Sequence, residues 1–253
     1  MTSAHPSQAT LDPEEIDRFA RLAGKWWDPE GEFRPLHKLG PARLSFIKSH
    51  LVRRFGLPER GLKPLAGLTI LDIGCGGGLI SEPLARLGGT VTGIDPATEN
   101  IATAIQHAEP QGLVIDYRTA RAEDLVEERT QFDAVVCLEV VEHVPDPQAF
   151  IRTCAALVRP GGLFITSTIN RTLKAFALAI VGAEYILRWL PVGTHQWDRF
   201  VTPEELARYC QAAGLQQPVF EGLIYNPLTG RWSLGQDTDV NYMAAADKPG
   251  STS

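Results

Sequence analysis

Glycines next to acidic residues form the part of the sequence best suited to hold a small cofactor. Residues 72–78 read Asp-Ile-Gly-Cys-Gly-Gly-Gly, directly after a predicted strand and before a predicted helix. Glycine lets the backbone turn tightly and approach a ligand closely because no Cβ is in the way. Asp72, before the turn, can hold a ligand cation. Asp95 ends the next predicted strand, where an acid can accept hydrogen bonds from both hydroxyls of a ribose.

Two cofactors compete for this glycine segment. A dinucleotide fingerprint, G-x-G-x-x-G from Gly74, needs glycine at position 79, which is Leu79. The pattern D-x-G-x-G-x-G is complete instead, with Gly76 as its second glycine, and it resembles motif I of class I S-adenosylmethionine (SAM)-dependent methyltransferases. SAM carries no pyrophosphate and needs no open helix N-terminus. The segment therefore favours SAM over NAD, and the plainer alternative is a glycine-rich turn without a ligand.

For two acidic residues the sequence also allows a purely structural role. Asp95 precedes Pro96 and can also cap a helix, and the two roles are compatible. Glu123, after the third predicted strand, is expected near the adenine edge of the cofactor. The alternative for Glu123 is a solvated acidic loop.

Alternating strands and helices must position these residues. Short apolar runs of the kind found in strands covered on both faces alternate with helical stretches, which predicts a doubly wound, mostly parallel seven-stranded α/β sheet of the Rossmann-like kind. The predicted strands are Thr69–Ile73, Thr90–Ile94, Val114–Tyr117, Ala134–Leu138 and Leu163–Thr168, with Val219–Tyr225 and Val240–Met243 as an antiparallel edge pair. The predicted helices are Ile80–Leu87, Asn100–His107, Pro147–Leu157 and Pro203–Ala213.

The segments on either side of this core complete the expected organisation. Asp12-Pro13-Glu14-Glu15 is a helix-start pattern, and the helix is expected to run to Trp27, followed by a second from Pro41 to Phe55. We expect a tail and lid helices over residues 1–66, a methyltransferase domain over 67–246 with an insertion at 171–200, and a disordered tail at 247–253.

Composition limits the classes of function. The chain has 253 residues, 44% hydrophobic, with a net charge of −6. An acidic chain has no general attraction for nucleic acid, so no nucleic-acid partner is expected. The four cysteines form no C-x-x-C pair, which argues against a zinc ribbon, and Cys75 and Cys137 are expected to be small core residues in a reducing compartment. With no secretory signal and no apolar run of the ~20 residues that span a bilayer, a cytoplasmic protein is expected.

Several motifs outside the glycine segment are more specific than it. Together they closely resemble the ubiquinone biosynthesis O-methyltransferase family, from about Ile16 to Met243. The motifs are Trp26-Trp27-Asp28, Gly31-Glu32-Phe33, Pro35-Leu36-His37, residues 137–147 (CLEVVEHVPDP), Ser167-Thr168-Ile169-Asn170-Arg171, Val181–Arg188 and Asp239–Met243.

The resemblance implies an activity and a set of SAM contacts. The implied reactions are two O-methylations, of a 2-polyprenyl-6-hydroxyphenol and of 3-demethylubiquinol. Positions matching Arg43, Gly74, Asp95 and Leu138 are implied to contact SAM. Arg43 can reach the methionine carboxylate from a lid helix, although without the resemblance a surface arginine is the default. Other enzymes of ubiquinone biosynthesis are implied as potential partners.

A phenol with a pKa of ~10 is a poor nucleophile at neutral pH and needs a base or a metal. His143 is the natural base by its pKa, with Glu142 beside it. Alternatively Glu139, Glu142 and His143, spaced i, i+3 and i+4, lie on one face if this stretch is helical, and two carboxylates with an imidazole suit Mg²⁺ or Zn²⁺. We favour the metal-assisted route. The plain alternative is that Glu142 and His143 only brace the loop.

A polyprenyl tail places the substrate in a bilayer. Leu173–Leu190, as a helix, gathers its polar groups in one narrow sector, which fits an amphipathic helix at an anionic membrane surface, on the inner face. A buried core helix is the alternative. Asn170 and Arg171 are expected to line the substrate mouth.

Two other functions remain open. One is C- or N-methylation of a different small molecule. The other is a non-catalytic scaffold of a lipid-biosynthesis complex that binds SAM only for stability, although an intact glycine motif together with an intact E-x-x-E-H argues against it.

Overall fold

The computed structural model of the chain describes residues 13–175, 197–226 and 228–250. One sheet carries the fold, with strands in the order β3-β2-β1-β4-β5-β8-β6-β7. Its strands are β1 Thr69–Ile73, β2 Thr90–Asp95, β3 Asp116–Thr119, β4 Phe132–Leu138, β5 Val158–Ile169, β6 Val219–Asn226, β7 Arg231–Gly235 and β8 Asn241–Asp247. The first five are parallel, and β8, β6 and β7 add antiparallel pairings.

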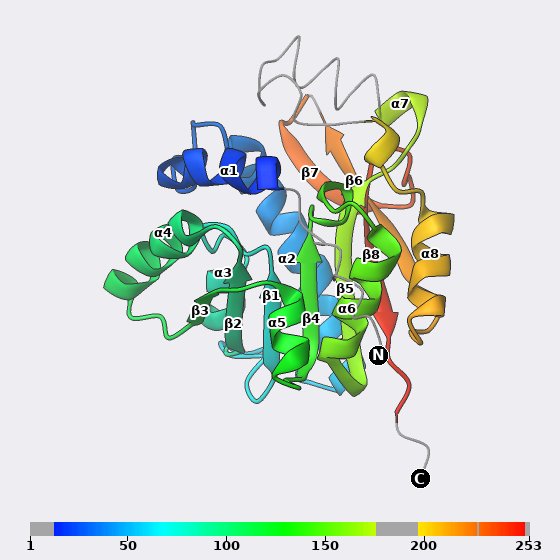
Figure 1. Ribbon diagram of the computed structural model, residues 1–253, viewed down its shortest axis with the longest axis horizontal. Helices are drawn as coiled ribbons and strands as arrows, with labels where there is room; N and C mark the ends of the chain where they lie inside the picture. The colour runs from blue at the N-terminus through cyan, green and yellow to red at the C-terminus, as the bar shows by residue number, and fades with distance from the viewer. Residues whose placement is uncertain (1–12, 176–196, 227, 251–253) are drawn as a thin grey trace, which may run out of the picture.

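Helices cover both faces of this sheet (Figure 1). The described helices are α1 Pro13–Leu22, α2 Arg34–Phe55, α3 Ser81–Arg86, α4 Thr98–Ala108, α5 Ala122–Glu127, α6 Pro147–Leu157, α7 Leu173–Ala175 and α8 Pro203–Ala212. Short 3₁₀ turns are η1 Ala23–Lys25, η2 Glu109–Gln111, η3 Val141–His143 and η5 Trp197–Arg199.

Successive residues of the central strands point to opposite faces, so each face builds its own core. Leu71 and Val135 pack under α5, α6 and α8. Ile70 and Ala134 pack on the other face with residues of α2 and α3. Burial on both faces fixes the strand register, because a shift by one residue would exchange the two cores.

The N-terminal elements lie at one end of the sheet. Figure 1 shows α1 at the end toward which β4 points, and α1 and η1 pack against α4. Ala23, Trp26 and Phe33 form a small apolar cluster separate from the two main cores. The N-terminal segment is therefore placed above the carboxyl ends of the parallel strands, where open α/β sheets bind ligands.

The doubly wound fold expected from the sequence is confirmed. β1 and α6 have the predicted bounds, and β6 and β8 pair antiparallel. The second helix begins at Arg34, so the predicted start at Pro41 is wrong: Pro35 occupies its first turn, and Pro41 lies inside. An eighth strand, β7, pairs with β6 at the edge and was not predicted.

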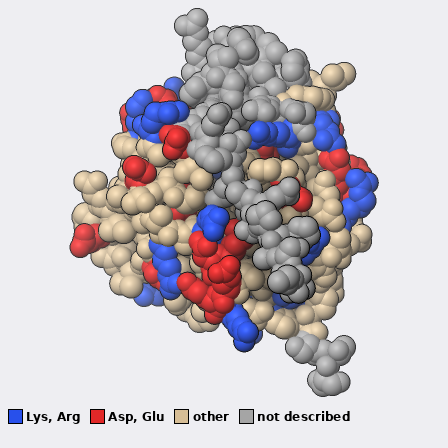
Figure 2. All heavy atoms as spheres, viewed as in Figure 1, with Lys and Arg blue, Asp and Glu red and all other residues tan. Residues whose placement is uncertain are grey.

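Figure 2 shows basic and acidic side chains interspersed on the face in view. Among the described helices, none combines the length and apolarity needed to cross a bilayer. Of the predicted helix Leu173–Leu190, the structure describes Leu173–Ala175 as α7, and the remainder lies outside the described residues.

Candidate functional site: a cavity at the carboxyl ends of the parallel strands

The glycine segment forms a turn held by backbone hydrogen bonds. The N–H groups of Gly74 and Cys75 both donate to the carbonyl oxygen of Ile94, at 2.8 and 3.0 Å. Gly74 and Gly76 have φ of 69° and 53°, a conformation open to glycine at little cost. The turn is thereby tied to the end of β2, next to Asp95.

Asp95 is the buried centre of this turn. One carboxylate oxygen, Oδ2, accepts from the Gly76 N–H at 3.1 Å. The other, Oδ1, accepts from the Ala97 N–H at 2.9 Å and from the Asn100 side-chain amide at 3.1 Å. Burial raises the pKa of Asp95, and these three hydrogen bonds oppose the rise. Asp95 thus braces the turn before α4 and lines the cavity, but the predicted alternative that it caps the helix is wrong, because the N-cap residue of α4 is Ala97.

Asp72 lies at the end of β1 and is also buried. Its Oδ2 accepts a hydrogen bond of 2.6 Å from the Ser81 hydroxyl. Burial raises the pKa of Asp72 to about 7. A buried carboxyl with that pKa favours a cationic ligand, since a nearby positive charge stabilises its ionised form.

The acid–histidine segment follows β4. Glu139 has φ of 53°, an uncommon conformation for a residue other than glycine. Only Val141–His143 forms a helical turn, and it is 3₁₀. The expectation that Glu139, Glu142 and His143 share one α-helical face is therefore wrong, because the chain turns sharply at Glu139.

Both acids of this segment have partners within the protein. Glu139 Oε1 accepts from Arg43 at 2.7 Å and from the Ser167 hydroxyl at 2.6 Å. Glu142 Oε2 accepts from the Thr168 hydroxyl at 2.8 Å. Burial, together with the charge of Glu139, raises the pKa of Glu142 to about 7. In the part of the chain that the structure describes, no three acidic, histidine or cysteine side chains are grouped so that they could hold a metal ion.

Arg43 comes from α2 and is almost fully buried. Besides its ion pair with Glu139, it has a buried Nε for which the described residues offer no hydrogen-bond partner. Buried donors are rarely left unpaired. Arg43 therefore has a donor available for an anionic group in the cavity that it lines.

One cavity of about 640 Å³ connects these residues. Most of the predicted cofactor, catalytic and metal residues line it: Arg43, Asp72, Gly74, Asp95, Glu123, Leu138, Glu139, Glu142 and His143. A Cβ added to Gly76 would collide with the ring of Trp26. The glycine turn and the acid–histidine segment therefore face one shared space.

Two predicted residues lie elsewhere. Among the described residues that line the cavity, neither Asn170 nor Arg171 is found. The Asn170 amide donates to the Thr238 carbonyl oxygen, and Arg171 pairs with Glu205 of α8. Both residues connect the end of β5 to neighbouring segments, so their expected place at the substrate mouth is not supported.

Sequence reasoning missed several lining residues. Trp26, Trp27, His37 and Asn100 line the cavity, and Trp26 donates from Nε1 to the Asn100 side-chain oxygen at 2.8 Å. The tryptophan pair was visible as a motif, but its contact with a helix more than seventy residues away was not.

The sequence and the fold of this chain are similar to those of known proteins. Residues 71–166 match a family described as a methyltransferase domain. A ubiquinone biosynthesis O-methyltransferase of Methylobacterium sp. (strain 4-46) is 54% identical over 244 residues, which cover 96% of this chain and 98% of that protein. Another, from Parvibaculum lavamentivorans, is 52% identical and covers 96% of each chain. This chain belongs to the ubiquinone biosynthesis O-methyltransferase family.

Solved structures confirm the fold of this family member. Magnesium protoporphyrin IX methyltransferase from Synechocystis PCC 6803, with bound SAH, superposes with a TM-score of 0.63 at 21% identity, covering 93% of this chain and 95% of that one. The DhpI–SAH complex gives a TM-score of 0.61 at 19% identity, covering 97% and 100%. The chain thus has the class I SAM-dependent methyltransferase fold expected from its glycine motif.

Proposed function

We propose that this protein transfers the methyl group of SAM to a phenolic hydroxyl of polyprenylated ubiquinone precursors, a 2-polyprenyl-6-hydroxyphenol and 3-demethylubiquinol. One observation carries the proposal: the glycine turn with its two acids and the acid–histidine segment line the same cavity. The names of the relatives, such as the Methylobacterium protein, supply the substrate class.

The cofactor side of the cavity suits the parts of SAM. Asp95 would accept hydrogen bonds from the ribose hydroxyls, Glu123 would lie toward the adenine, and Leu138 would contact the cofactor. Asp72 would pair with the ammonium group, and Arg43 would donate its Nε–H to the carboxylate. Gly74 and Gly76 keep the turn close to the ligand. When bound, SAM would supply a methyl group activated by its bond to a positively charged sulfur, for transfer to a nucleophilic oxygen.

The acceptor side supplies the base. A phenol must lose its proton as its oxygen attacks, because its pKa of ~10 leaves little phenolate at neutral pH. His143 lines the cavity directly after the 3₁₀ residue Glu142 and takes this proton on its imidazole. Glu142, buried beside it, stabilises the imidazolium when ionised.

One observation supports a metal-assisted mechanism: Glu139, Glu142 and His143 all line the cavity. A divalent ion would lower the pKa of the phenol. As placed, however, the acids do not fit a metal site: Glu139 is held by Arg43 and Ser167, and Glu142 by Thr168. EDTA treatment decides between the routes. Activity lost to EDTA and restored by Mg²⁺ or Zn²⁺ would support the metal, and unchanged activity would leave His143 as the base.

Peripheral binding to anionic membranes belongs to the same proposal. The substrate tail requires it, and Leu173, at the start of α7, is 81% exposed. Co-sedimentation with liposomes, with and without anionic lipid, measures this binding. Equal recovery in the supernatant with and without vesicles would argue against it.

Transfer of tritium from methyl-labelled SAM to a demethylated quinol tests the function directly. A quinol that stays unlabelled while an amine or a carbon acid becomes labelled would point to N- or C-methylation. Binding of SAM without transfer to any acceptor would support the non-catalytic scaffold.

A further inference from the structure

Residues 26–37, which we call the lid segment, cross directly over the glycine turn. The Trp26 ring packs flat on Phe33, with centroids 3.9 Å apart and planes 5° apart, and lies against Gly76 and Gly77. Its Nε1 donates to Asn100, whose amide in turn donates to Asp95. The lid segment thus reaches, through one intermediate side chain, the carboxylate proposed to hold the ribose.

A second tryptophan fastens the lid segment to the domain below. Trp27 Nε1 donates to the Gly77 carbonyl oxygen at 2.9 Å. The Trp27 ring stacks on His107, at the end of α4, with centroids 3.4 Å apart and planes 7° apart. Stacked aromatic pairs add attraction beyond the area that they bury. At the other end of the segment, His37 Nε2 lies 2.8 Å from the Trp26 carbonyl oxygen and donates to it.

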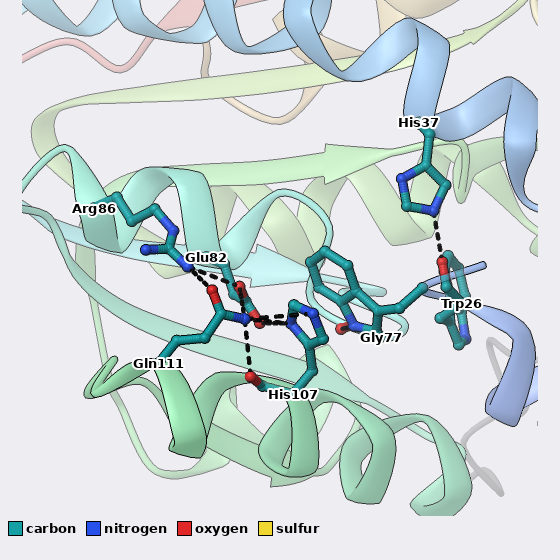
Figure 3. A network of polar contacts seen from close by, with 8 residues as sticks. Trp26, His37, Gly77, Glu82, Arg86, His107 and Gln111 are labelled. Atoms are coloured by element: carbon teal, nitrogen blue, oxygen red, sulfur yellow. Dashed lines mark hydrogen bonds and ion pairs between the residues drawn. The ribbon is translucent and has the colours of Figure 1, made fainter. Parts of the chain in front are cut away.

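His107 is itself held in place from α3. Its Nδ1 lies 2.6 Å from Glu82 Oε1, and because a carboxylate only accepts, Nδ1 carries the hydrogen. Figure 3 shows Glu82, Arg86, His107 and Gln111 directed toward one another. Glu82 is 2% exposed, and Arg86 and Gln111 approach its other oxygen at 3.7 and 3.4 Å. A buried carboxylate with these donors fixes the plane of the His107 ring on which Trp27 lies.

The lid segment is built to open without disturbing the sheet. Most of its apolar residues belong to the small cluster of Ala23, Trp26 and Phe33, and Leu36, in the first turn of α2, also packs against the core beneath α2. Units with few buried apolar contacts open at a fraction of the free energy needed for global unfolding. The Trp26 and Trp27 end of the segment is tied to the domain by the tryptophan hydrogen bonds and the stack on His107, and residues 34–37 continue into α2.

We infer that Trp27, His107 and Glu82 are positioning residues that hold the lid segment closed over the cofactor and set the rate at which S-adenosylhomocysteine (SAH) leaves. This inference rests on the proposed placement of the cofactor between Gly74 and Asp95. Trp26 lies over that place, so SAH leaves after the segment lifts. The stack on His107 must break for it to lift.

The rate of SAH release tests the inference. Full-length protein is loaded with tritiated SAH, and the loss of label is followed after excess unlabelled SAH is added. We expect release to become about tenfold faster in Trp27→Leu and His107→Ala, equivalent to ~1.4 kcal/mol of barrier, and less so in Glu82→Gln. Trp27→Phe keeps a ring on His107 and should fall between Trp27→Leu and the unchanged protein.

A matched control comes from the same helix. Gln106 is exposed and adjoins His107, so Gln106→Ala should leave the release rate unchanged. In steady state the Trp27 and His107 variants should raise the KM for SAM about tenfold while kcat falls less than threefold. A merely structural role would lower the Tm without this division between KM and kcat.

Trypsin sensitivity gives a second measurement that uses only the unchanged protein. Arg21 and Lys25 are exposed just before the lid segment, and SAH should slow cleavage there several-fold. Equal cleavage with and without SAH, or equal SAH release in folded Trp27 and His107 variants, would overturn the inference. A protein that binds no SAH at all would instead overturn the proposed function.

Discussion

The two sides of the cavity are held by different kinds of interaction. On the cofactor side, backbone hydrogen bonds from Gly74, Cys75 and Gly76 fix the turn to the end of β2. On the acceptor side, long side chains such as Arg43 and Glu139 hold the segment after β4. The first set of contacts joins the ends of two neighbouring strands, with Gly76 and Asp95 19 positions apart, whereas Arg43 and Glu139 are 96 positions apart.

This difference suggests a division of labour. A turn fixed by its backbone gives a rigid binding site for the cofactor, which is the same molecule in both proposed methylations. Side chains can adjust to two acceptors of different substitution. Variants on the cofactor side should therefore affect binding of SAM, and variants on the acceptor side should affect the chemical step.

The largest expected effect is on the acceptor side. His143→Ala removes the proposed base, and kcat should fall by about 10²–10⁴-fold, the usual contribution of general-base catalysis. The affinity for SAH should stay within about twofold, because His143 is not part of the glycine turn. Single-turnover methyl transfer and calorimetry measure the two quantities. A variant that keeps its kcat would remove His143 from the mechanism.

A glycine pair tests the cofactor side. Gly76 and Gly112 both have positive φ, 53° and 66°, but an added Cβ meets the Trp26 ring at Gly76 and open space at Gly112. Gly76→Ala should weaken SAH binding about a hundredfold, equivalent to ~2.7 kcal/mol, because it displaces the ring. Gly112→Ala should only lower stability by about 1 kcal/mol through backbone strain. Equal SAH affinities in the two variants would contradict the close packing of Trp26 on the turn.

The Arg43–Glu139 pair joins the two sides. Arg43→Met leaves the partly buried Glu139 without its ion-pair partner and should destabilise the protein by about 2–3 kcal/mol. Adding Glu139→Gln should recover part of that loss, since no charge is then left unpaired. Urea unfolding of both single variants and the double variant gives the coupling energy. If the losses in free energy of unfolding of the two single variants add up to that of the double variant, the coupling energy is zero and the ion pair does not stabilise the protein.

The smallest effect is the pH dependence of stability at Asp72. The pKa of Asp72 in the folded protein is about 7, above the ordinary 3.8. The protonated carboxyl of Asp72 therefore makes its full contribution to the free energy of unfolding below about pH 4, and this contribution is lost as the pH rises to 7. The stability of Asp72→Asn relative to the unchanged protein should therefore increase from pH 5 to 7, by about 1.4 kcal/mol per pH unit at most. Above pH 7 it should level off. A difference that does not vary with pH would mean that Asp72 is ionised at pH 5.

Much of the cofactor side could be predicted because its signals are local. The Asp72–Gly78 pattern and the apolar run of β1 lie within ten residues of one another, and both are as expected. Asp95 could be placed because parallel strands end at the same edge of the sheet. Pro147 at the first turn of α6, after the Asp146 cap, likewise gave the correct helix start.

The rest could not be predicted because its signals are weak or distant. β3 is exposed at the sheet edge, so the apolar residue Val114 suggested a start two residues too early. The short β7 carries mixed polarity and follows a turn, which gave no periodic pattern. Glu139 has a positive φ although it is not glycine, so its residue type does not indicate the turn. The stack of Trp27 on His107 joins residues eighty positions apart.

The place of β8 has a consequence for how the chain is made. β8 is the last strand in the sequence, yet it pairs with β5 on one side and with β6 on the other. The hairpin of β6 and β7 therefore has no neighbour to join until residues 241–247 have left the ribosome. Because non-local strand pairing is slow and open strand edges invite aggregation, a nascent chain should expose the edge of β5 until residues 241–247 have emerged, and removal of β8 should leave both β5 and the hairpin of β6 and β7 without a partner strand.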